Sequence, residues 1–127
     1  MRFMVMVKAT PNSEAGVMPG PEMFEAMGKY NEQLVKAGIM KAGEGLKPSS
    51  KGARVHFAGA RRAVIDGPFA ETKEQLAGFY LIEARDLNEA IQVASKIPPA
   101  RVGSIEVRPV RPIRERPRSA GMPLRQD

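Results

Sequence analysis

The segment VIDGPFAETKEQLAGFYLIEA, residues 64–84, places a turn motif and a charged run between two strand-like segments. It contains an Asp-Gly-Pro-Phe turn, then a charged run, then the most regular strand pattern of the sequence at residues 77–84. A tight turn needs only Gly, Pro or Asn. The additional carboxylate of Asp66 and the ring of Phe69 therefore indicate either an elaborate connection between two strands or the rim of a site.

The composition is that of one globular domain, with 127 residues, 43% of them hydrophobic and 27% charged. The absence of cysteine excludes disulfides and thiolate chemistry. His56 is the one histidine, so a conventional zinc or copper site would lack nitrogen and sulfur ligands. No dinucleotide-binding or phosphate-binding glycine motif is present. We therefore expect neither a metal nor a cofactor.

The amino-terminal segment MRFMVMVKAT has no signal-peptide pattern and is too short to span a membrane. We therefore expect a cytoplasmic protein with no membrane partner. The net charge is +6, and half of it lies in residues 111–127, which contain five arginines and two acidic residues. The rest of the chain shows no Lys/Arg stripe interleaved with aromatic residues, so nucleic acid is not an expected partner. The sequence thus predicts a domain at residues 1–110 and a basic, Pro/Arg-rich tail at 111–127.

Alternation of apolar residues predicts the strands. Residues 2–8 place Phe3, Val5 and Val7 on one face and Met4, Met6 and Lys8 on the other. Further strands are expected at residues 39–46, 53–59, 61–67, 77–84 and 103–110. Those at 53–59 and 61–67 are expected to form a hairpin that turns near Gly59.

Two segments have helical spacing. One runs from about Pro21 to Ala37 and ends before Gly38, a residue suited to a left-handed cap. The other follows Asp86, an N-cap residue, with Glu89 completing a capping box. Its expected buried stripe consists of Leu87, Ala90, Ile91, Ala94 and Ile97. The segment between Lys8 and Pro21 is expected to be a loop.

Without the hairpin, the element order is βαββαβ, which predicts an α+β, ferredoxin-like core with an inserted β-hairpin. Two helices cover only one face of such a sheet. The other face is expected to show apolar side chains that need a cover, namely Met4, Met6, Val64 or Ile65, and Phe79 or Tyr80. A second copy of the chain is the simplest cover, so we expect a homodimer.

The motifs DGPF at 66–69, ETKE at 71–74 and EVRP at 106–109, in this order, resemble the DGPF branch of the YCII-related proteins. The resemblance extends from residue 1 to about residue 113. It implies the dimeric α+β barrel superfamily, whose members include lactone isomerases, cofactor-free monooxygenases and dehydrohalogenating enzymes that act on small cyclic substrates. The His–Asp pair proposed for shorter relatives has no counterpart here, because the helix at 21–37 lacks histidine and Lys36 stands near its end.

Asp66 is the main candidate site residue. Its carboxylate either accepts backbone N–H groups within the turn or acts as a general base in a cleft. Lys8 either anchors an anionic ligand or pairs with a carboxylate such as Asp66 or Glu44; the alternative is that it leads the chain out to solvent over a buried stem. Phe69 is a candidate ligand contact beside Asp66. His56 is read as an ordinary strand residue.

Three functions follow as hypotheses. The first is binding of a small organic ligand in a cleft near the DGPF turn, with Lys8, Asp66 and Phe69 at the site. The second is a cofactor-independent isomerase or dehydrohalogenase that uses Asp66 as its base. The third is a regulatory interaction module whose basic tail contacts an acidic partner. The tail is expected to pack along the partner subunit.

Overall fold

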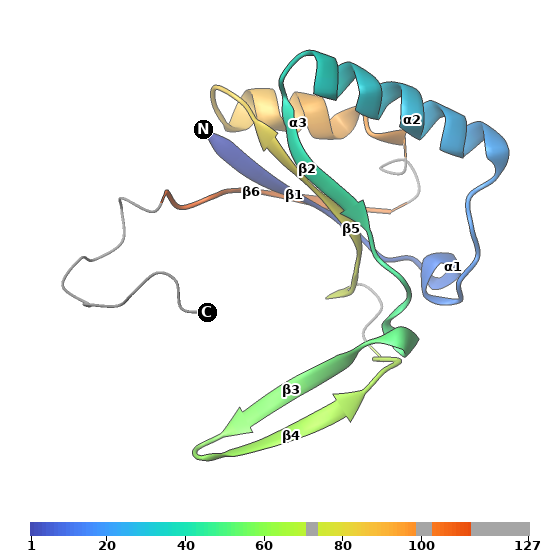
Figure 1. The fold of residues 1–127 in the computed structure, drawn as a ribbon, viewed down its shortest axis with the longest axis vertical. Helices are drawn as coiled ribbons and strands as arrows, with labels where there is room; N and C mark the ends of the chain where they lie inside the picture. Colours follow the sequence, from blue (N-terminus) through green and yellow to red (C-terminus); the bar gives the residue numbers. More distant parts are fainter. Residues whose placement is uncertain (71–73, 99–102, 113–127) are drawn as a thin grey trace.

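The computed structural model describes residues 1–70, 74–98 and 103–112, and its chain path confirms the α+β, ferredoxin-like order with a separate hairpin (Figure 1). In the described part of the chain, no helix is long and apolar enough to cross a membrane. The elements in chain order are β1 Arg2–Lys8, α1 Pro11–Glu14, α2 Pro21–Lys36, β2 Met40–Gly45, the 3₁₀ turn Ser49–Lys51, β3 Ala53–Ala58, β4 Arg61–Asp66, β5 Leu76–Glu83, α3 Leu87–Ser95 and β6 Ile105–Pro109.

The main sheet has the strand order β2-β5-β1-β6, and every neighbouring pair is antiparallel. Its register places Phe3 opposite Ile82 and Val5 opposite Tyr80. These four side chains point to the same face and are buried, at 8% exposure or less. Because side chains alternate between faces along a strand, the alternation in residues 2–8 correctly predicted which residues form the core.

Helices α2 and α3 lie side by side on that face and complete the core (Figure 1). Leu34 is the fully buried residue of α2. The hydroxyl of Tyr80 donates a hydrogen bond of 2.7 Å to Oδ1 of Asn31, and the hydroxyl of Tyr30 donates one of 2.7 Å to the carbonyl of Val93. The two tyrosines therefore tie α2 to the sheet and to α3. The predicted end of α2 is also confirmed, since Gly38 has a φ of +73°.

The predicted stripe of α3 is wrong at two positions. Ala90, Ala94 and Ile97 are buried, but Leu87 and Ile91 are 47% and 46% exposed. The helix contacts the core through a narrow line of small residues, and these two residues lie beside that line. Asp86 caps the helix as predicted, accepting the amide of Glu89.

The carboxylate of Glu89 does not close the predicted capping box on Asp86. It instead accepts the amide of Arg85, one residue earlier in the chain, at 2.8 Å. It also forms an ion pair of 3.0 Å with the side chain of Arg85. The carboxylates of Asp86 and Glu89 thus accept two backbone amides at the start of α3, those of Glu89 and Arg85.

The segment expected to be a loop contains the short helix α1. Its N-cap Thr10 and residue Ser13 form a reciprocal capping box, and Pro11 occupies the first helical position. Thr, Pro and Ser mark loops as well as helix N-termini. Helix α1 was not predicted because no apolar periodicity follows these residues.

The face of the main sheet away from the helices is called here the open face. Its central side chains are Met4, Met6, Phe79 and Leu81, which the register places together. The prediction of Phe79 or Tyr80 is thereby resolved in favour of Phe79. The expectation of Val64 or Ile65 on this face is wrong, because both lie in the separate two-stranded sheet β3–β4. That hairpin projects on the side of the sheet opposite the helices (Figure 1).

Candidate functional site

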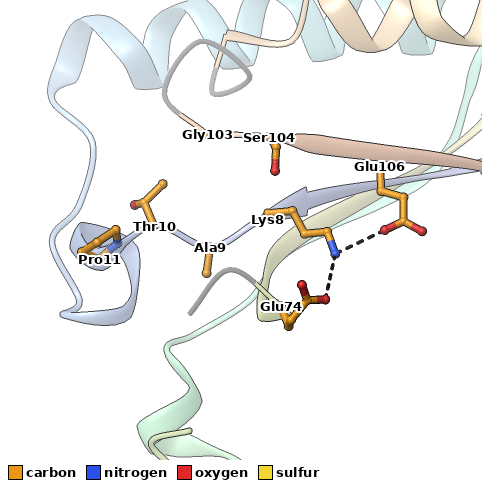
Figure 2. Close-up of a pocket in the computed structure, with 8 residues that line it drawn as sticks. All are labelled: Lys8, Ala9, Thr10, Pro11, Glu74, Gly103, Ser104 and Glu106. Atoms are coloured by element: carbon orange, nitrogen blue, oxygen red, sulfur yellow. Dashed lines mark ion pairs between the residues drawn. The ribbon is translucent and has the colours of Figure 1, made fainter. Parts of the chain in front are cut away.

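A hollow of about 660 Å³ lies where β1 ends and β6 begins (Figure 2). Its lining combines an ammonium group, two carboxylates, hydroxyl groups and small residues. The lining residues are Lys8, Ala9, Thr10, Pro11, Glu74, Gly103, Ser104 and Glu106.

The backbone around Lys8 shapes this hollow. The register between β1 and β5 shifts between Val7 and Lys8, so that β1 departs from regular pairing at its end. The amide of Lys8 donates to the carbonyl of Ser104 at 3.0 Å, and the amide of Ala9 donates to that of Gln75 at 2.8 Å. These two bonds hold the end of β1 between the residue that precedes β6 and the residue that precedes β5.

Three charged side chains meet in the hollow (Figure 2). Nζ of Lys8 lies 3.3 Å from Oε1 of Glu106 and 4.0 Å from Oε1 of Glu74. The Lys8 side chain is 16% exposed, whereas those of Glu106 and Glu74 are 44% and 72% exposed. The second oxygen of Glu106 lies 3.9 Å from Nε of Arg108. The hollow thus offers a sheltered donor flanked by two carboxylate acceptors.

Lys8 is the one predicted site residue that lines this hollow. Its carboxylate partners are Glu106 and Glu74, so the expected pairing with Asp66 or Glu44 is wrong. The β1–β6 register explains the difference, because Glu106 lies opposite Met6 and on the same face as Lys8.

Asp66 and Phe69 lie elsewhere, at the base of the hairpin. Asp66 is the last residue of β4 and is exposed. Within the described residues, its carboxylate accepts no hydrogen bond and forms no ion pair, so the expected bonding to backbone amides of the turn is not found. The Phe69 amide donates to Oγ of Ser49 at 3.1 Å, and its ring lies 4.0 Å below the guanidinium of Arg54.

Ser49 joins the turn to α1. One oxygen of Glu14 accepts the Ser49 amide at 3.0 Å, and the other is hydrogen-bonded to the Ser49 hydroxyl. These two bonds hold the pKa of Glu14 below its ordinary value of 4.5. The amide of Gly67 donates to the carbonyl of Gly52 at 3.0 Å, and the Gly67–Pro68 peptide is cis. The DGPF turn therefore has a bonding network of its own.

Sequence reasoning missed the two carboxylates of the hollow as site residues. Glu106 carried a usable signal, since it faces away from Ile105 and Val107 on a strand whose other face enters the core. Glu74 carried none, because its position depends on how β5 begins. Among the residues that the structure describes, no group of three or more His, Asp and Glu side chains is placed to hold a metal ion.

Comparison with solved structures supports the fold. The chain resembles the 5-chloro-2-hydroxyhydroquinone dehydrochlorinase TftG of Burkholderia phenoliruptrix AC1100, solved in complex with 2,5-dihydroxybenzoquinone. The TM-score is 0.53 with 19% sequence identity, over 91% of this chain and 98% of that one. At this identity the match shows a shared fold.

A curated relative is an uncharacterized protein of Rhizobium meliloti (strain 1021), 44% identical over 80 residues. That match spans 61% of this chain and 64% of the relative, which is less than two thirds of its length. The model of the YCII-related domain matches residues 1–114, a range that includes every residue that the structure describes. The chain therefore belongs to the YCII-related family.

Proposed function

We propose that this protein binds a small organic compound that carries both hydroxyl and carbonyl oxygens, in the hollow around Lys8. The observation that carries the proposal is the sheltered Lys8 ammonium between the carboxylates of Glu106 and Glu74. An ammonium can only donate hydrogen bonds, and ionised carboxylates can only accept them. A ligand with both kinds of oxygen would satisfy Lys8 through its carbonyl and the carboxylates through its hydroxyl groups.

The fold match supports this class of ligand. The solved dehydrochlorinase holds 2,5-dihydroxybenzoquinone, a ring that carries two hydroxyl and two carbonyl oxygens. A compound with one negative charge and no donor would fit the hollow less well, because two carboxylates flank the single ammonium. The charge pattern therefore favours a hydroxylated ring over a simple carboxylate or phosphate.

A second candidate function is a cofactor-independent isomerase or dehydrohalogenase with Asp66 as its general base. One observation favours it: the Asp66 carboxylate is exposed and has no hydrogen-bond or ion-pair partner among the described residues. A carboxylate that is not engaged in the turn remains available to remove a proton from a bound substrate. The binding site would then lie at the DGPF turn beside Phe69.

The third hypothesis, a regulatory module acting through the basic tail, depends on residues that lie outside the described part of the chain from residue 113 onward. The same holds for the expected packing of the tail on a partner subunit. Neither proposal draws support from the hollow.

A binding measurement with 3,5-dihydroxyacetophenone, whose hydroxyl groups stay protonated near neutral pH and which also carries a carbonyl oxygen, tests the two sites against each other. We would titrate wild type, Lys8→Met and Asp66→Asn by calorimetry and record thermal unfolding with and without the compound. A ligand present at about 100 times its Kd stabilises a protein by about 2.7 kcal/mol, which is readily measured. We expect Lys8→Met to weaken binding at least about tenfold and Asp66→Asn to retain it.

The opposite result, with binding lost in Asp66→Asn and kept in Lys8→Met, would move the site to the DGPF turn. Equal binding in all three proteins would exclude both sites for this compound. Release of chloride from a chlorinated hydroxyhydroquinone, abolished by Asp66→Asn, would establish the second candidate function. Thermal unfolding without ligand shows whether either variant is misfolded.

A further inference from the structure

The hollow around Lys8 places a hydrogen-bond donor beside a base. Nζ of Lys8 lies 3.3 Å from Oε1 of Glu106, and both residues line the hollow (Figure 2). An ammonium has three N–H donors, and the ion-pair partners of Nζ in the described part of the chain are Glu106 and Glu74. A further donor therefore remains for the carbonyl oxygen of a ligand, which would then lie next to Glu106.

The main sheet holds both groups in place. Lys8 is the last residue of β1, and its amide is bonded to the carbonyl of Ser104 just before β6. Glu106 lies within β6, opposite Met6, and its second oxygen is 3.9 Å from Nε of Arg108. Groups on strands keep their geometry more precisely than groups on loops. The ammonium and the carboxylate are thus positioned before a ligand binds.

Glu106 is better placed than Glu74 to act as the base. Its side chain is 44% exposed, whereas that of Glu74 is 72% exposed and lies farther from Nζ of Lys8. Glu106 also shares the open face with Met6, and the β1–β5 register places Phe79 on the other side of Met6. Apolar side chains beside a few polar groups are the usual surroundings of a small organic ligand.

We propose that the protein catalyses proton transfer at a carbon next to a carbonyl group, with Glu106 as the base and Lys8 as the donor to the carbonyl oxygen. This inference rests on the proposed function, because it concerns the ligand bound in the hollow. The substrate class is a hydroxylated ring compound with a ketone whose α-carbon carries hydrogen. The reacting group differs from that of the Asp66 candidate, which would act at the DGPF turn.

The step needs no co-reactant. The carboxylate of Glu106 takes the α-proton, the C–H electron pair becomes a C=C bond, and the carbonyl π pair moves onto oxygen. Negative charge thus passes from Glu106 to an enolate oxygen bonded to the same ammonium, so the total charge of the hollow is unchanged. A donor already aimed at the developing charge lowers the barrier of such a step. Reversal of the electron flow returns the proton from Glu106 to carbon.

Hydrogen exchange of 3,5-dihydroxyacetophenone measures this step, because its methyl group is next to the carbonyl. Wild type, Glu106→Gln and Glu44→Gln would be incubated with the compound in D₂O, and deuterium in the methyl group followed by NMR. Glu44 is the matched control, since it lies on the open face opposite Phe79 and outside the lining of the hollow. We expect exchange above the buffer rate with wild type and Glu44→Gln, and a rate lowered about a hundredfold in Glu106→Gln.

Glu106→Asp gives a second test of the base, independent of how well Glu106→Gln folds. It keeps a negative charge beside Lys8 but withdraws the carboxylate, so it should also exchange the methyl hydrogens more slowly than wild type. Thermal unfolding shows whether each variant is folded. Exchange at the wild-type rate in both Glu106 variants, or an equal loss in Glu44→Gln, would overturn the proposal.

Calorimetry with the same compound separates this inference from the proposed function. We expect Glu106→Gln to bind with a Kd within about tenfold of wild type, so that its loss lies in the proton transfer. Wild type that binds the compound without exchange above the buffer rate would overturn the proton transfer and leave the proposed function standing. Absence of binding by wild type would overturn both.

Discussion

The carbonyl oxygen of Ser49 occupies the place that a side chain at Gly67 would need. A Cβ atom added to Gly67 would lie 1.8 Å from that oxygen and 2.6 Å from the carbonyl carbon. The DGPF turn and the Ser49–Gly52 segment therefore approach each other backbone to backbone. This contact explains why a glycine stands in the motif, and it fixes the base of the hairpin to the body.

The first prediction concerns Gly67→Ala. The obstructing atoms belong to the backbone of Ser49, so they cannot move aside by a change of rotamer. The hairpin base must shift, and forced overpacking of this kind usually costs about 1–3 kcal/mol. We expect a lower free energy of unfolding in urea and faster hydrogen exchange of the β3 and β4 amides.

Gly28→Ala is the matched control, because a Cβ on Gly28 in α2 meets nothing within 4 Å. Alanine is a better helix former than glycine by about 0.5–1 kcal/mol, so this variant should be as stable as wild type or more so. An unchanged urea midpoint for Gly67→Ala, with unchanged exchange in the hairpin, would show that the Ser49 contact does not fix the turn.

The second prediction concerns Glu14 and pH. Its pKa is lowered by the hydrogen bonds from Ser49, so folding favours the ionised form. The resulting stability is fully present above the ordinary value of 4.5 and is lost as pH falls through the lower pKa of the folded state. Wild type should therefore lose stability on acidification, and Glu14→Gln should lose less, in urea unfolding from about pH 6 to about pH 3.

Glu83 contributes a separate acid dependence. Its carboxylate lies 2.6 Å from the amino group of Met1, whose hydrogen bond lowers the pKa of Glu83. The pKa of Glu83 is lowered, as that of Glu14 is, so Glu14→Gln should keep part of the loss of stability on acidification. The double variant Glu14→Gln/Glu83→Gln should lose still less stability as the pH falls. Identical slopes for wild type and Glu14→Gln would mean that the Ser49 bonds persist when Glu14 is protonated.

The fold was predictable because burial of one face of a strand or helix requires apolar residues at a regular spacing in the sequence. Phe3 and Val5 had to share a face, and so did Tyr80 and Ile82, once the segments were strands. The helices were equally clear, since Pro21, Gly38 and Asp86 mark their ends. Leu87 and Ile91 were wrongly predicted to be buried because the buried face of α3 is narrower than expected. The width of that face depends on how closely α3 approaches the sheet.

The hollow was not predictable to the same degree because it depends on register. Lys8 and Glu106 are distant in sequence and meet only because β1 pairs with β6 in one alignment. A shift of one residue would place Glu106 on the core face. Motif reasoning pointed instead to Asp66, since the DGPF turn is conspicuous in the sequence. In the structure that turn anchors the hairpin through Gly67 and Phe69.

The third prediction compares two neighbouring residues of α2. Leu34 is 4% exposed and belongs to the core cluster, whereas Val35 is 58% exposed. Leu34→Ala should lower the free energy of unfolding by about 2–5 kcal/mol, because it leaves a cavity beneath the helix. Val35→Ala should change it by less than about 0.5 kcal/mol. Chemical denaturation of both variants measures the difference, and similar losses would show that α2 does not pack as described.

The fourth prediction uses the two tyrosines, Tyr30 and Tyr80, as internal probes, since the chain has no tryptophan and no cysteine. Burial raises the pKa of both phenols above the ordinary value of 10.0, and a charge on Tyr80 raises that of Tyr30 further. Folding therefore favours the protonated phenols, and the stability they contribute is lost as pH rises above the ordinary value. Ultraviolet titration of tyrosinate should show both groups ionising later in the folded protein than in urea.

Tyr80→Phe separates the two groups. It removes one ionisation and the neighbouring charge, so the remaining titration of Tyr30 should move toward, but not reach, its position in urea. Burial of Tyr30 against α3, where its hydroxyl bonds to the carbonyl of Val93, is retained in this variant. Circular dichroism at each pH restricts the comparison to folded protein. A Tyr30 titration at the urea position, in protein that is still folded, would show that the contact between α2 and α3 is open in solution.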